Sequence, residues 1–526
     1  MAMKIHLICA YVLVFASSDL LHAQGAGTRL SQSDTESARL SEDQIVPHVL
    51  NRAAFGAQPG QAEAVKQIGW REWIRQQLQP AKIDDTQVES YVVQRWPTLG
   101  MTLDQLLQQD YMKMEQVRKH LPPSVIYRAV HSDRQLQEVI VTFWRNHFSV
   151  DQNKDSVGFY TGDYEKMLRR YAFGQFDRLL LATAQHPAML TFLDNDVSQK
   201  PLTDSQQRLI ERYESRDRKP RSVRALARHR GLNENYAREL MELHTLGVDN
   251  YYTQQDVIGL ARALTGWTVG RGDGTPFGQA GDKFGFYFHQ DVHDRNAKVV
   301  VGKRLSAGKG VEEGIRIVRQ LAAHPGTARF ISYKLCRYLV CDEPSPKLVR
   351  RVARVFRRTK GDLPKVYEAI LLSDDFLQPQ HYRVKFKTPF EFVVSALRAT
   401  GAEITDYEAI LHSLRLMGYD IYGCMDPTGY YDQAEAWLDP GVLVYRWDFA
   451  VRLGEGMIRG VQIPDTFMDP LNNLPPERLQ AVLLDWLLPG GVSTQTHSLL
   501  GRELAKAYSE RQAVGLVVGS PVFQQQ

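Results

Sequence analysis

Cysteine is scarce in this chain, with four in 526 residues. Cys9 follows Ile8 rather than a small residue, which is unlike a lipoprotein cysteine. The other three leave an odd number, so one disulfide and one free thiol are allowed in an oxidising compartment. Cys336 and Cys341 lie five residues apart in a segment with a helical pattern, which is poor geometry for a mutual disulfide. We therefore expect buried free thiols, not a disulfide scaffold.

Several catalytic and binding motifs are also missing. The sequence contains no Gly-x-Ser-x-Gly and no cysteine in an electropositive motif, so nucleophilic catalysis has little support. It has no two histidines flanking a glutamate at four-residue spacing, and no paired CxxC. The glycine-rich run at residues 270–274 lacks both a preceding strand and a following Lys-Ser/Thr, which disfavours nucleotide binding.

Net charge is small, at +4, in a chain that is 43% apolar and 24% charged. This is the composition of an ordinary soluble globular protein. Nucleic-acid binding depends on a clustered basic face and not on a weak overall charge, so we expect no nucleic-acid partner.

The N-terminus has the layout of a secretory signal peptide. Lys4 precedes an apolar run over residues 5–16, and cleavage is plausible after Ala23. The run is too short for a stable membrane span, although an uncleaved anchor is the alternative. Residues 24–42 are predicted to be a flexible leader. We expect an exported protein, periplasmic or secreted.

Hydrophobic periodicity predicts a mainly α fold over residues 43–526, either one large multi-helix domain or closely packed helical lobes. Amphipathic helices are expected at 61–78, 103–118 and 134–148. A small antiparallel β ribbon is expected at 284–305, because Phe284, Phe286 and Phe288 alternate and residues 298–301 are rich in valine. Thr253 and Asp256 predict a capping box for a helix that ends at Gly266 and Trp267.

Residues 196–230 are rich in arginine and poor in large apolar side chains. We interpret this segment as a solvated, mobile loop, with a patch for an anionic partner as the alternative.

The most unusual stretch is residues 233–253, NENYARELMELHTLGVDNYYT. It predicts a helix with Asn233 as N-cap and Gly247 as the C-terminal stop. One face carries Tyr236, Leu240, Leu243 and His244; another carries Asn235, Glu239 and Glu242; and Arg238 lies four residues before Glu242.

A second helix ends in the same way, with Val139, Phe143 and His147 at helical spacing. Both histidines should point inward, and the two helices should pack together. His293 and Asp294 lie in the connection of the predicted β ribbon. We expect them to join the two helical histidines in one polar centre. A buried hydrogen-bond network is the simplest interpretation of such a centre.

Two chemical interpretations use the same groups. Acid/base catalysis would use Glu239, His244, His293 and Asp294. A metal site would use His147, His244 and Glu239 to bind zinc, manganese or iron. Asn235, Arg238 and Glu242 would support either site.

Aromatic residues are frequent among the Gly- and Pro-rich loops predicted at 418–447: Tyr419, Tyr422, Tyr430, Tyr431, Trp437, Tyr445 and Trp447. Such rings can stack on sugars or peptides, or fill an interface between lobes.

Motifs along the chain resemble a bacterial family, the domain of unknown function 1800. They are LNRAAFG at 50, FWRNHF at 143, NENYARELMELHTLGVD at 233, YTQQDVIGLARALTGW at 252, His293-Asp294 with Lys298, KTPFEFVVSALRATG at 387 and GSPVFQ at 519. The resemblance implies an exported, mainly helical protein, often encoded beside a sulfatase-like family. It implies no reaction and no catalytic residues.

Two function hypotheses follow. The first is an acid/base or metal-assisted hydrolase-like enzyme that acts on an extracellular polymer or metabolite. The second is a non-catalytic envelope protein that binds a sulfatase-like neighbour or a polysaccharide.

Overall fold

The computed structural model describes residues 39–216, 218–227, 229–270 and 285–526. The predicted signal peptide, most of the predicted leader, Phe284 and most of the glycine-rich run at 270–274 lie outside the described residues. The fold is mainly helical, as predicted, with only short two-stranded sheets in the described part of the chain.

The chain begins with a group of short helices and one long helix. These are α2 (Glu42–Ala53), α3 (Gln61–Ile68), α4 (Trp70–Gln77), η1 (Pro80–Lys82), α5 (Thr86–Arg95), η2 (Pro97–Gly100), α6 (Leu103–Leu107) and α7 (Tyr111–His131). Two predicted helices are each divided. Gly69, at φ +82°, separates α3 from α4. Asp110 caps a new helix through a hydrogen bond from the Lys113 N–H, so α6 and α7 are distinct.

The middle of the chain carries the helices with the predicted site. They are α8 (Gln135–His147), α9 (Val157–Tyr171), α10 (Phe176–Ala184), α11 (Pro187–Phe192), η3 (Asn195–Val197), α12 (Asp204–Tyr213), α13 (Arg221–Ala227), α14 (Asn235–Glu242) and α15 (Gln254–Leu264). Helix α8 confirms the helix predicted at 134–148. The capping box of Thr253 and Asp256 is present at the start of α15.

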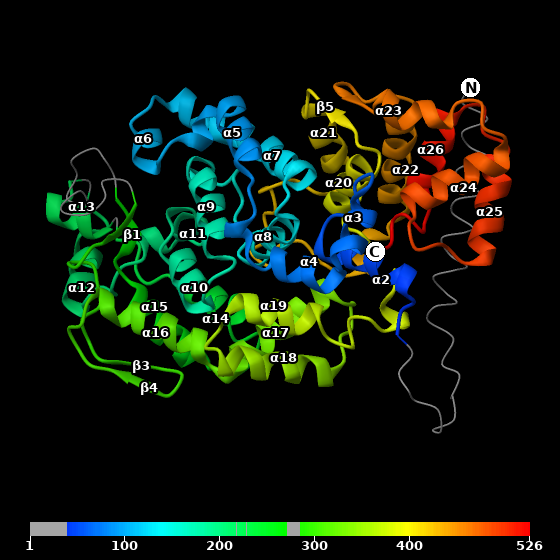
Figure 1. Cartoon of the computed structure of the whole chain (residues 1–526). Coiled ribbons are helices and arrows are strands. Elements are labelled where there is room, and N and C mark those ends of the chain that lie inside the picture. The colour runs from blue at the N-terminus through cyan, green and yellow to red at the C-terminus, as the bar shows by residue number, and fades with distance from the viewer. Residues whose placement is uncertain (1–38, 217, 228, 271–284) are drawn as a thin grey trace.

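The prediction of a loop over residues 196–230 was wrong. The segment forms α12 and α13, and Thr203 caps α12 in a capping box with Gln206. Arginine, glutamine and glutamate are good helix formers, so a charged composition did not imply an irregular backbone. No residue of α12 is buried, and the pair lies at one end of the molecule (Figure 1).

The prediction of antiparallel strands was correct, but the prediction that they pair with one another in a single ribbon was wrong. Strand β2 (Phe286–Phe288) pairs antiparallel with β1 (Trp267–Val269), and β3 (Lys298–Val300) pairs with β4 (Lys303–Leu305). The expected end of α15 at Trp267 was also wrong. The helix ends at Leu264, and Gly266, at φ +80°, turns the chain so that Trp267 begins a strand.

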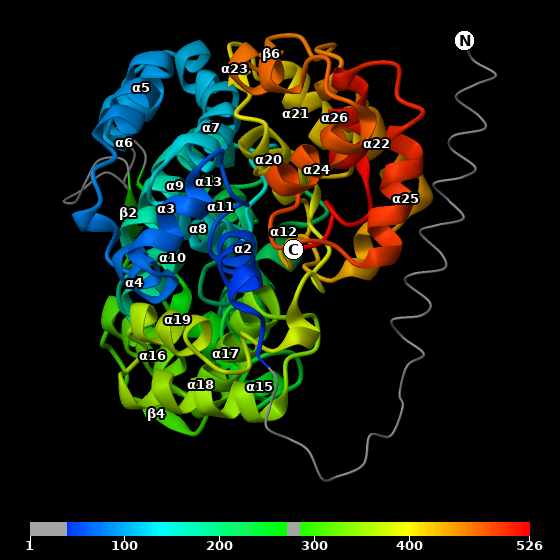
Figure 2. The same cartoon turned by 45° about the vertical axis from the view of Figure 1, so that its right-hand side comes forward.

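The C-terminal half returns to helices. It contains α16 (Val311–Ala323), α17 (Pro325–Leu339), α18 (Pro346–Arg358), α19 (Leu363–Leu371), η4 (Pro379–His381), α20 (Pro389–Ala399), β5 (Glu403–Ile404), α21 (Glu408–Leu416), η5 (Ala434–Trp437), α22 (Pro440–Gly454), β6 (Val461–Gln462), α23 (Asp465–Met468), η6 (Asp469–Leu471), α24 (Pro476–Leu487), α25 (Thr494–Leu504) and α26 (Glu510–Gly519). Helices α16–α19 lie along one side, and α20–α26 form the end opposite α12 and α13 (Figure 1). A view turned by 45° again shows α16–α19 at the bottom, and it shows α22 and α24–α26 at the upper right (Figure 2).

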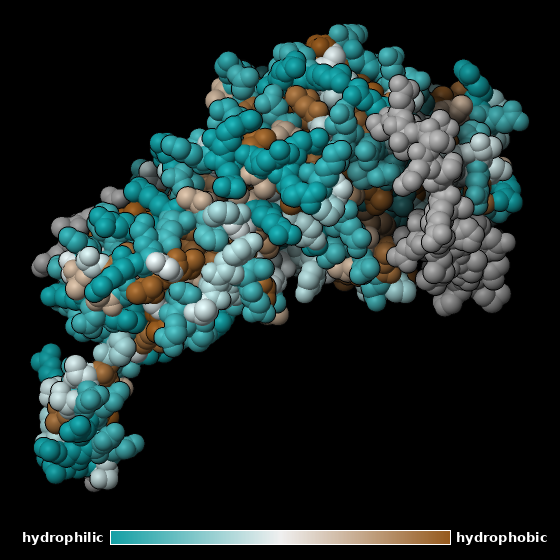
Figure 3. Space-filling view, turned by 90° about the horizontal axis from the view of Figure 1, so that it is seen from below, coloured by the Kyte–Doolittle hydropathy of each residue, from teal (hydrophilic) through white to brown (hydrophobic). Residues whose placement is uncertain are grey.

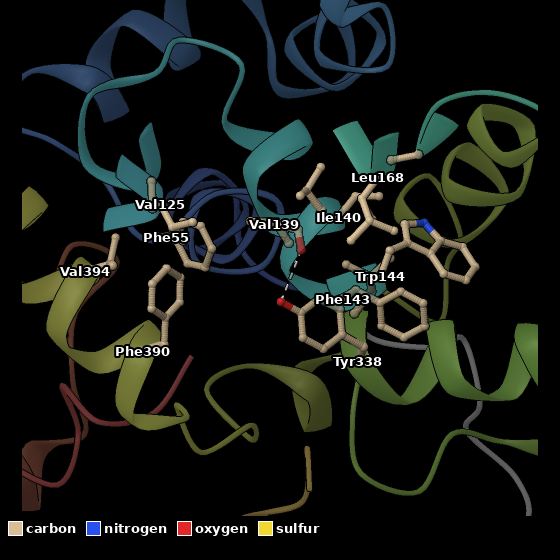
Figure 4. Packing of buried hydrophobic residues seen from close by; sticks show 14 of the residues in the cluster. Phe55, Val125, Val139, Ile140, Phe143, Trp144, Leu168, Tyr338, Phe390 and Val394 are labelled. Carbon is tan, nitrogen blue, oxygen red and sulfur yellow. Dashed lines mark hydrogen bonds between the residues drawn. The ribbon is translucent and has the colours of Figure 1, made fainter. Parts of the chain in front are cut away.

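One cluster of buried hydrophobic residues runs from Val46 to Phe523. Helix α8 lies within it, and the indole of Trp144 donates to the hydroxyl of Tyr367 at 2.8 Å. Figure 4 shows Phe55 against Phe390, and Phe143 beside Tyr338. Helix α8 is thus held from several sides, which fixes the position of His147 at its end.

The surface is mostly hydrophilic with scattered hydrophobic groups on the face seen in Figure 3. No helix in the described residues has the length and apolar character needed to span a membrane. The three described cysteines are free thiols, as predicted; Cys336 and Cys341 are buried and Cys424 is partly buried.

Candidate functional site

His147 is the last residue of α8 and is almost fully buried, at 2% exposure. Four residues earlier on the same face, Phe143 stacks parallel to it, with ring centroids 5.9 Å apart. This is the i, i+4 neighbour relationship that the sequence predicted. The imidazole is therefore held by the apolar face of its own helix.

His244 lies just beyond the end of α14. The helix predicted over residues 233–247 is shorter than expected, because α14 covers only Asn235–Glu242. The N–H of His244 bonds the carbonyl of Glu239, and that of Leu246 bonds the carbonyl of Met241, each reaching back five residues. This wide last turn ends at Gly247, at φ +88°, and leaves His244 at 1% exposure.

The two imidazoles lie together, as predicted, with ring centroids 6.1 Å apart. Nε2 of His147 lies 3.4 Å from the carbonyl oxygen of His244. The other three ring nitrogens, Nδ1 of His147 and both nitrogens of His244, are buried without a hydrogen-bond partner. Buried polar atoms are normally satisfied, so this pair is unusual for a purely structural core.

Both histidines are neutral at physiological pH. Burial, followed by the nearby charge of Lys334, lowers the pKa of His244 to about 3. The same two causes hold the pKa of His147 well below its usual value. A neutral imidazole can both donate and accept a hydrogen bond, whereas a protonated ring can only donate.

A cleft of about 230 Å³ opens beside His147. The polar side chains that line it include Asn146, His147, Lys334, Arg337, Glu391 and Asp432. The aromatic side chains that line it are Phe143, Phe330, Tyr333, Tyr338, Tyr419, Tyr430 and Tyr431. Such a concave, mostly aromatic cavity with a few charged groups is the usual form of a small-ligand site.

Lys334, on α17, is the most perturbed cation in this cleft. Burial and the neighbouring charge of Arg337 lower its pKa to about 8, although the carboxylate of Asp432 opposes the shift. A substantial fraction of the amine is therefore unprotonated in mildly alkaline solution. Sequence reasoning missed Lys334 and Arg337. The sequence does contain a sign of them: Lys334 and Arg337 lie at helical spacing from the aromatic residues Phe330 and Tyr338.

The aromatic loop, residues 418–439, forms the wall of the cleft opposite α17. The ring of Tyr430 stacks on Tyr419 at 4.5 Å and contacts Trp437 at 6.1 Å. Predicted loop positions beyond 439 are helical, because α22 begins at Pro440, and Tyr445 and Trp447 belong to that helix. Tyr422 lies elsewhere and donates to the buried carboxylate of Glu165.

Asn146 fastens this loop to α8. Its side chain exchanges two hydrogen bonds with the backbone of Tyr430. Gly429, at φ +73°, lies so close that a Cβ there would be 2.3 Å from the Asn146 carbonyl oxygen. The predicted histidine centre and the predicted aromatic binding region therefore belong to one site.

Glu239, on α14, lies close enough to Asp426 of the aromatic loop to interact with its charge. Burial raises its pKa, and the charges of Glu242 and Asp426 add to the effect. No hydrogen bond or ion pair joins its carboxylate to His147 or His244 in the described part of the chain. The structure brings Glu239 near the site but not into contact with the imidazoles.

The predicted supporting residues form a surface network. Arg238 lies 3.5 Å from Glu242 and 3.8 Å from Glu234, and it donates to Gln254. The backbone N–H of Asn235 donates to Asn233. These contacts join α14 to α15. None of them involves the imidazole of His147 or His244.

His293 and Asp294 form a second cluster. Nδ1 of His293 lies 2.8 Å from the carbonyl oxygen of Thr265, and the carboxylate of Asp294 accepts from Arg262. Burial lowers the pKa of His293. Burial alone would raise the pKa of Asp294, but hydrogen bonds from Arg262 and Asn296 outweigh it and lower the value.

The centre of this second cluster is a buried ion pair between Lys298 and Glu313. Nε2 of His293 lies 3.5 Å from the same glutamate. None of the hydrogen bonds or ion pairs of this cluster reaches His147 or His244 among the described residues. The single polar centre expected from the sequence is thus divided into two.

Metal binding receives no support from the ligand arrangement. Among the residues that the structure describes, no three His, Cys, Asp or Glu side chains are grouped so that they could hold a metal ion. His147 and His244 are adjacent, but Glu239 does not complete a ligand set. The assignment of these three residues to zinc, manganese or iron stays a prediction.

A family model described as "Protein of unknown function (DUF1800)" matches residues 48–525. This match confirms the resemblance identified from the sequence motifs and covers nearly the whole described chain. No curated protein and no solved structure matches the chain.

Proposed function

The chain belongs to the DUF1800 family, whose function is unknown, and from the geometry of its cleft we propose that it is an exported enzyme of the acid/base type, with hydrolysis as its reaction. The observation that carries the proposal is that His147 and Lys334 line the same cleft. Burial lowers the pKa of Lys334 to about 8, as suits a group that exchanges protons near neutral pH, and burial also keeps the imidazole of His147 neutral.

In hydrolysis, the unprotonated amine of Lys334 accepts a proton from the attacking water and returns it to the leaving group. General acid/base groups work best when their pKa lies near the working pH, which suits a value of about 8. His147, neutral throughout this range, offers a ring that can exchange hydrogen bonds with the substrate. His244 acts through His147, as a positioning residue behind it.

Glu239 is not among the residues that line the cleft, so in this proposal it transfers no proton. Burial raises the pKa of its carboxyl, but no hydrogen bond or ion pair among the described residues joins that carboxyl to His147 or Lys334. His293 and Asp294, which the sequence added to the catalytic set, have contacts that support a structural role for them.

The substrate class follows from the walls of the cleft. Aromatic rings favour a ligand with a ring or apolar face. The charged groups are mixed, since Lys334 and Arg337 lie in the same cleft as Glu391 and Asp432, and they favour a ligand with several polar groups. A segment of an extracellular polymer, or a polar metabolite, has both properties. Export rests on the signal-peptide pattern that ends at Ala23.

The alternative is a non-catalytic envelope protein that binds a polysaccharide or a sulfatase-like neighbour. The arginine-rich segment that contains α12 and α13 favours it, because α12 is exposed at one end of the molecule, where an anionic partner could reach the segment (Figure 1). In that case, the cleft would hold a ligand without changing it.

The test is a conversion assay. The purified protein is incubated with size-fractionated envelope polysaccharides and peptidoglycan fragments, and new reducing ends, amines and carboxylates are followed by mass spectrometry. We expect wild-type conversion to increase through pH 8, and Lys334→Met and His147→Gln to lose it while remaining folded. Lys365→Met, at an exposed position, is the matched control.

Two results would count against the enzyme. If Lys334→Met and His147→Gln both convert substrate at the wild-type rate, the cleft is not the active site. If the wild type binds a fraction tightly without converting it, the binding-protein alternative is favoured.

A further inference from the structure

A second, much smaller cavity lies on the other side of the segment that leads into α20. Its volume is about 20 Å³, and its polar wall includes Asn51, Arg383, Lys387, Ser395 and Gln525. A space of this size holds one water molecule or one monatomic ion. Two of its polar groups are cations, and no Asp or Glu lines it within the described residues.

Arg383 is only partly satisfied. One nitrogen of its guanidinium, Nη2, donates to the carbonyl of Pro489 at 3.0 Å. Nε and Nη1 are buried without a hydrogen-bond partner. Unpaired buried donors of a charged group are costly, so an acceptor is expected beside them.

Lys387 is more deeply buried, at 4% exposure. Its Nζ donates to the carbonyl of Phe523 at 2.7 Å and lies over the ring of that residue. Neither contact supplies a negative charge. Burial lowers the pKa of Lys387 to about 7, and the charges of Arg383, Arg446 and Arg52 add to the effect, while Glu391 opposes it.

Arg446, on α22, increases this excess of positive charge. It is fully buried, and its guanidinium lies over the rings of Phe386 and Phe392. Nε, Nη1 and Nη2 all lack a hydrogen-bond partner. Glu391 interacts with all three cations of this group, Arg52, Lys387 and Arg446, and Asp342 acts on Arg52 alone.

We propose that the small cavity is a binding site for one chloride-sized monovalent anion, held by Arg383 and Lys387. A water molecule would fill the space but would leave the charges uncompensated, and a buried charge without a partner is strongly destabilising. The volume of about 20 Å³ suits an ion about the size of a water molecule. The anion neutralises Lys387, which directly precedes Thr388, the residue that caps α20.

The site is tested by melting the full-length mature chain in sodium chloride and in sodium gluconate at equal ionic strength. Gluconate is too large to enter the cavity. We expect chloride to raise the Tm saturably, by roughly 2 °C. The increase should be lost in Arg383→Gln and in Lys387→Met, and kept in Arg459→Gln, which removes an equal charge from an exposed position.

Crystals soaked in sodium bromide give a second, direct readout that does not depend on any variant folding. An anomalous bromide peak between Arg383 and Lys387, together with the chloride-dependent Tm, would establish the site. The proposal is overturned if the cavity shows no bromide, or if chloride raises the Tm of all variants equally. Bromide without any effect of chloride on Tm would show binding at crystal concentration only, and would also overturn it.

Discussion

Asn146 and Tyr430 exchange two hydrogen bonds of 2.7 Å: the side-chain amide of Asn146 donates to the Tyr430 carbonyl, and the Tyr430 N–H donates back to its oxygen. Asn146 directly precedes His147, so the contact joins the histidine wall of the cleft to its aromatic wall. This side chain therefore helps to set the shape of the cleft.

Replacing Asn146 by alanine should loosen the aromatic loop. It removes both hydrogen bonds and leaves the backbone of Tyr430 unpaired, at a cost of about 1–3 kcal/mol. Hydrogen exchange should accelerate over residues 424–437 and remain unchanged in α9. Asn472→Ala, on the surface, is the control. Unchanged exchange in the loop would show that other contacts hold it.

Gly429→Ala should displace the loop more strongly than Gly418→Ala. Both glycines have positive φ, so both substitutions strain the backbone. Only Gly429 also meets an obstacle, because its Cβ would lie 2.3 Å from the Asn146 carbonyl oxygen, whereas nothing lies within 4 Å at Gly418. Thermal melts of the two variants separate the clash from the strain. Equal losses of Tm would mean that the close approach is unimportant.

Lys334→Met should stabilise the protein at pH 7. The folded-state pKa of about 8 lies below the usual value of 10.5, so folding opposes the charged form. Between these values the unfolded chain binds a proton that the folded chain does not, and wild-type stability increases with pH. The advantage of the methionine variant should therefore shrink as pH increases above 8.

Denaturant melts from pH 6 to pH 10 check this dependence. Lys365→Met, whose side chain is 60% exposed, should show no such trend. A difference between Lys334→Met and wild type that stays constant with pH would contradict the lowered pKa.

Lys298→Met should destabilise the fold without altering the cleft. Lys298 and Glu313 are both buried, and removing one partner of a buried ion pair costs about 3–5 kcal/mol. Urea melts should show the loss, while binding of a cleft ligand by the remaining folded protein stays at the wild-type affinity. Weakened binding in fully folded variant protein would mean that the two clusters are coupled.

Chelation should leave the Tm unchanged. The described residues offer no three-ligand group, and a bound metal would otherwise stabilise the folded state by mass action. The measurement is a melt before and after treatment with EDTA, with metal content determined by mass spectrometry. A fall in Tm, abolished in His147→Ala and His244→Ala, would support the metal prediction instead.

The positions of His147 and His244 could be predicted because they depend on local periodicity. Val139, Phe143 and His147 share one helical face, and the structure buries all three. The segment around α12 shows that amino-acid composition alone does not predict secondary structure. Its charged residues form a helix with a capping box at Thr203 and Gln206, whereas the density of arginine predicts a solvated, mobile loop.

By itself, the sequence determined the mainly helical fold, the family, and the inward direction of the two histidines. It could do so because helical spacing and capping are relationships among residues close in the chain. Only the tertiary structure placed Lys334 opposite the aromatic loop and separated His293 from His244. Those outcomes depend on which helix faces pack against each other when the helices are far apart in the sequence. Local hydrophobic patterns do not specify that packing.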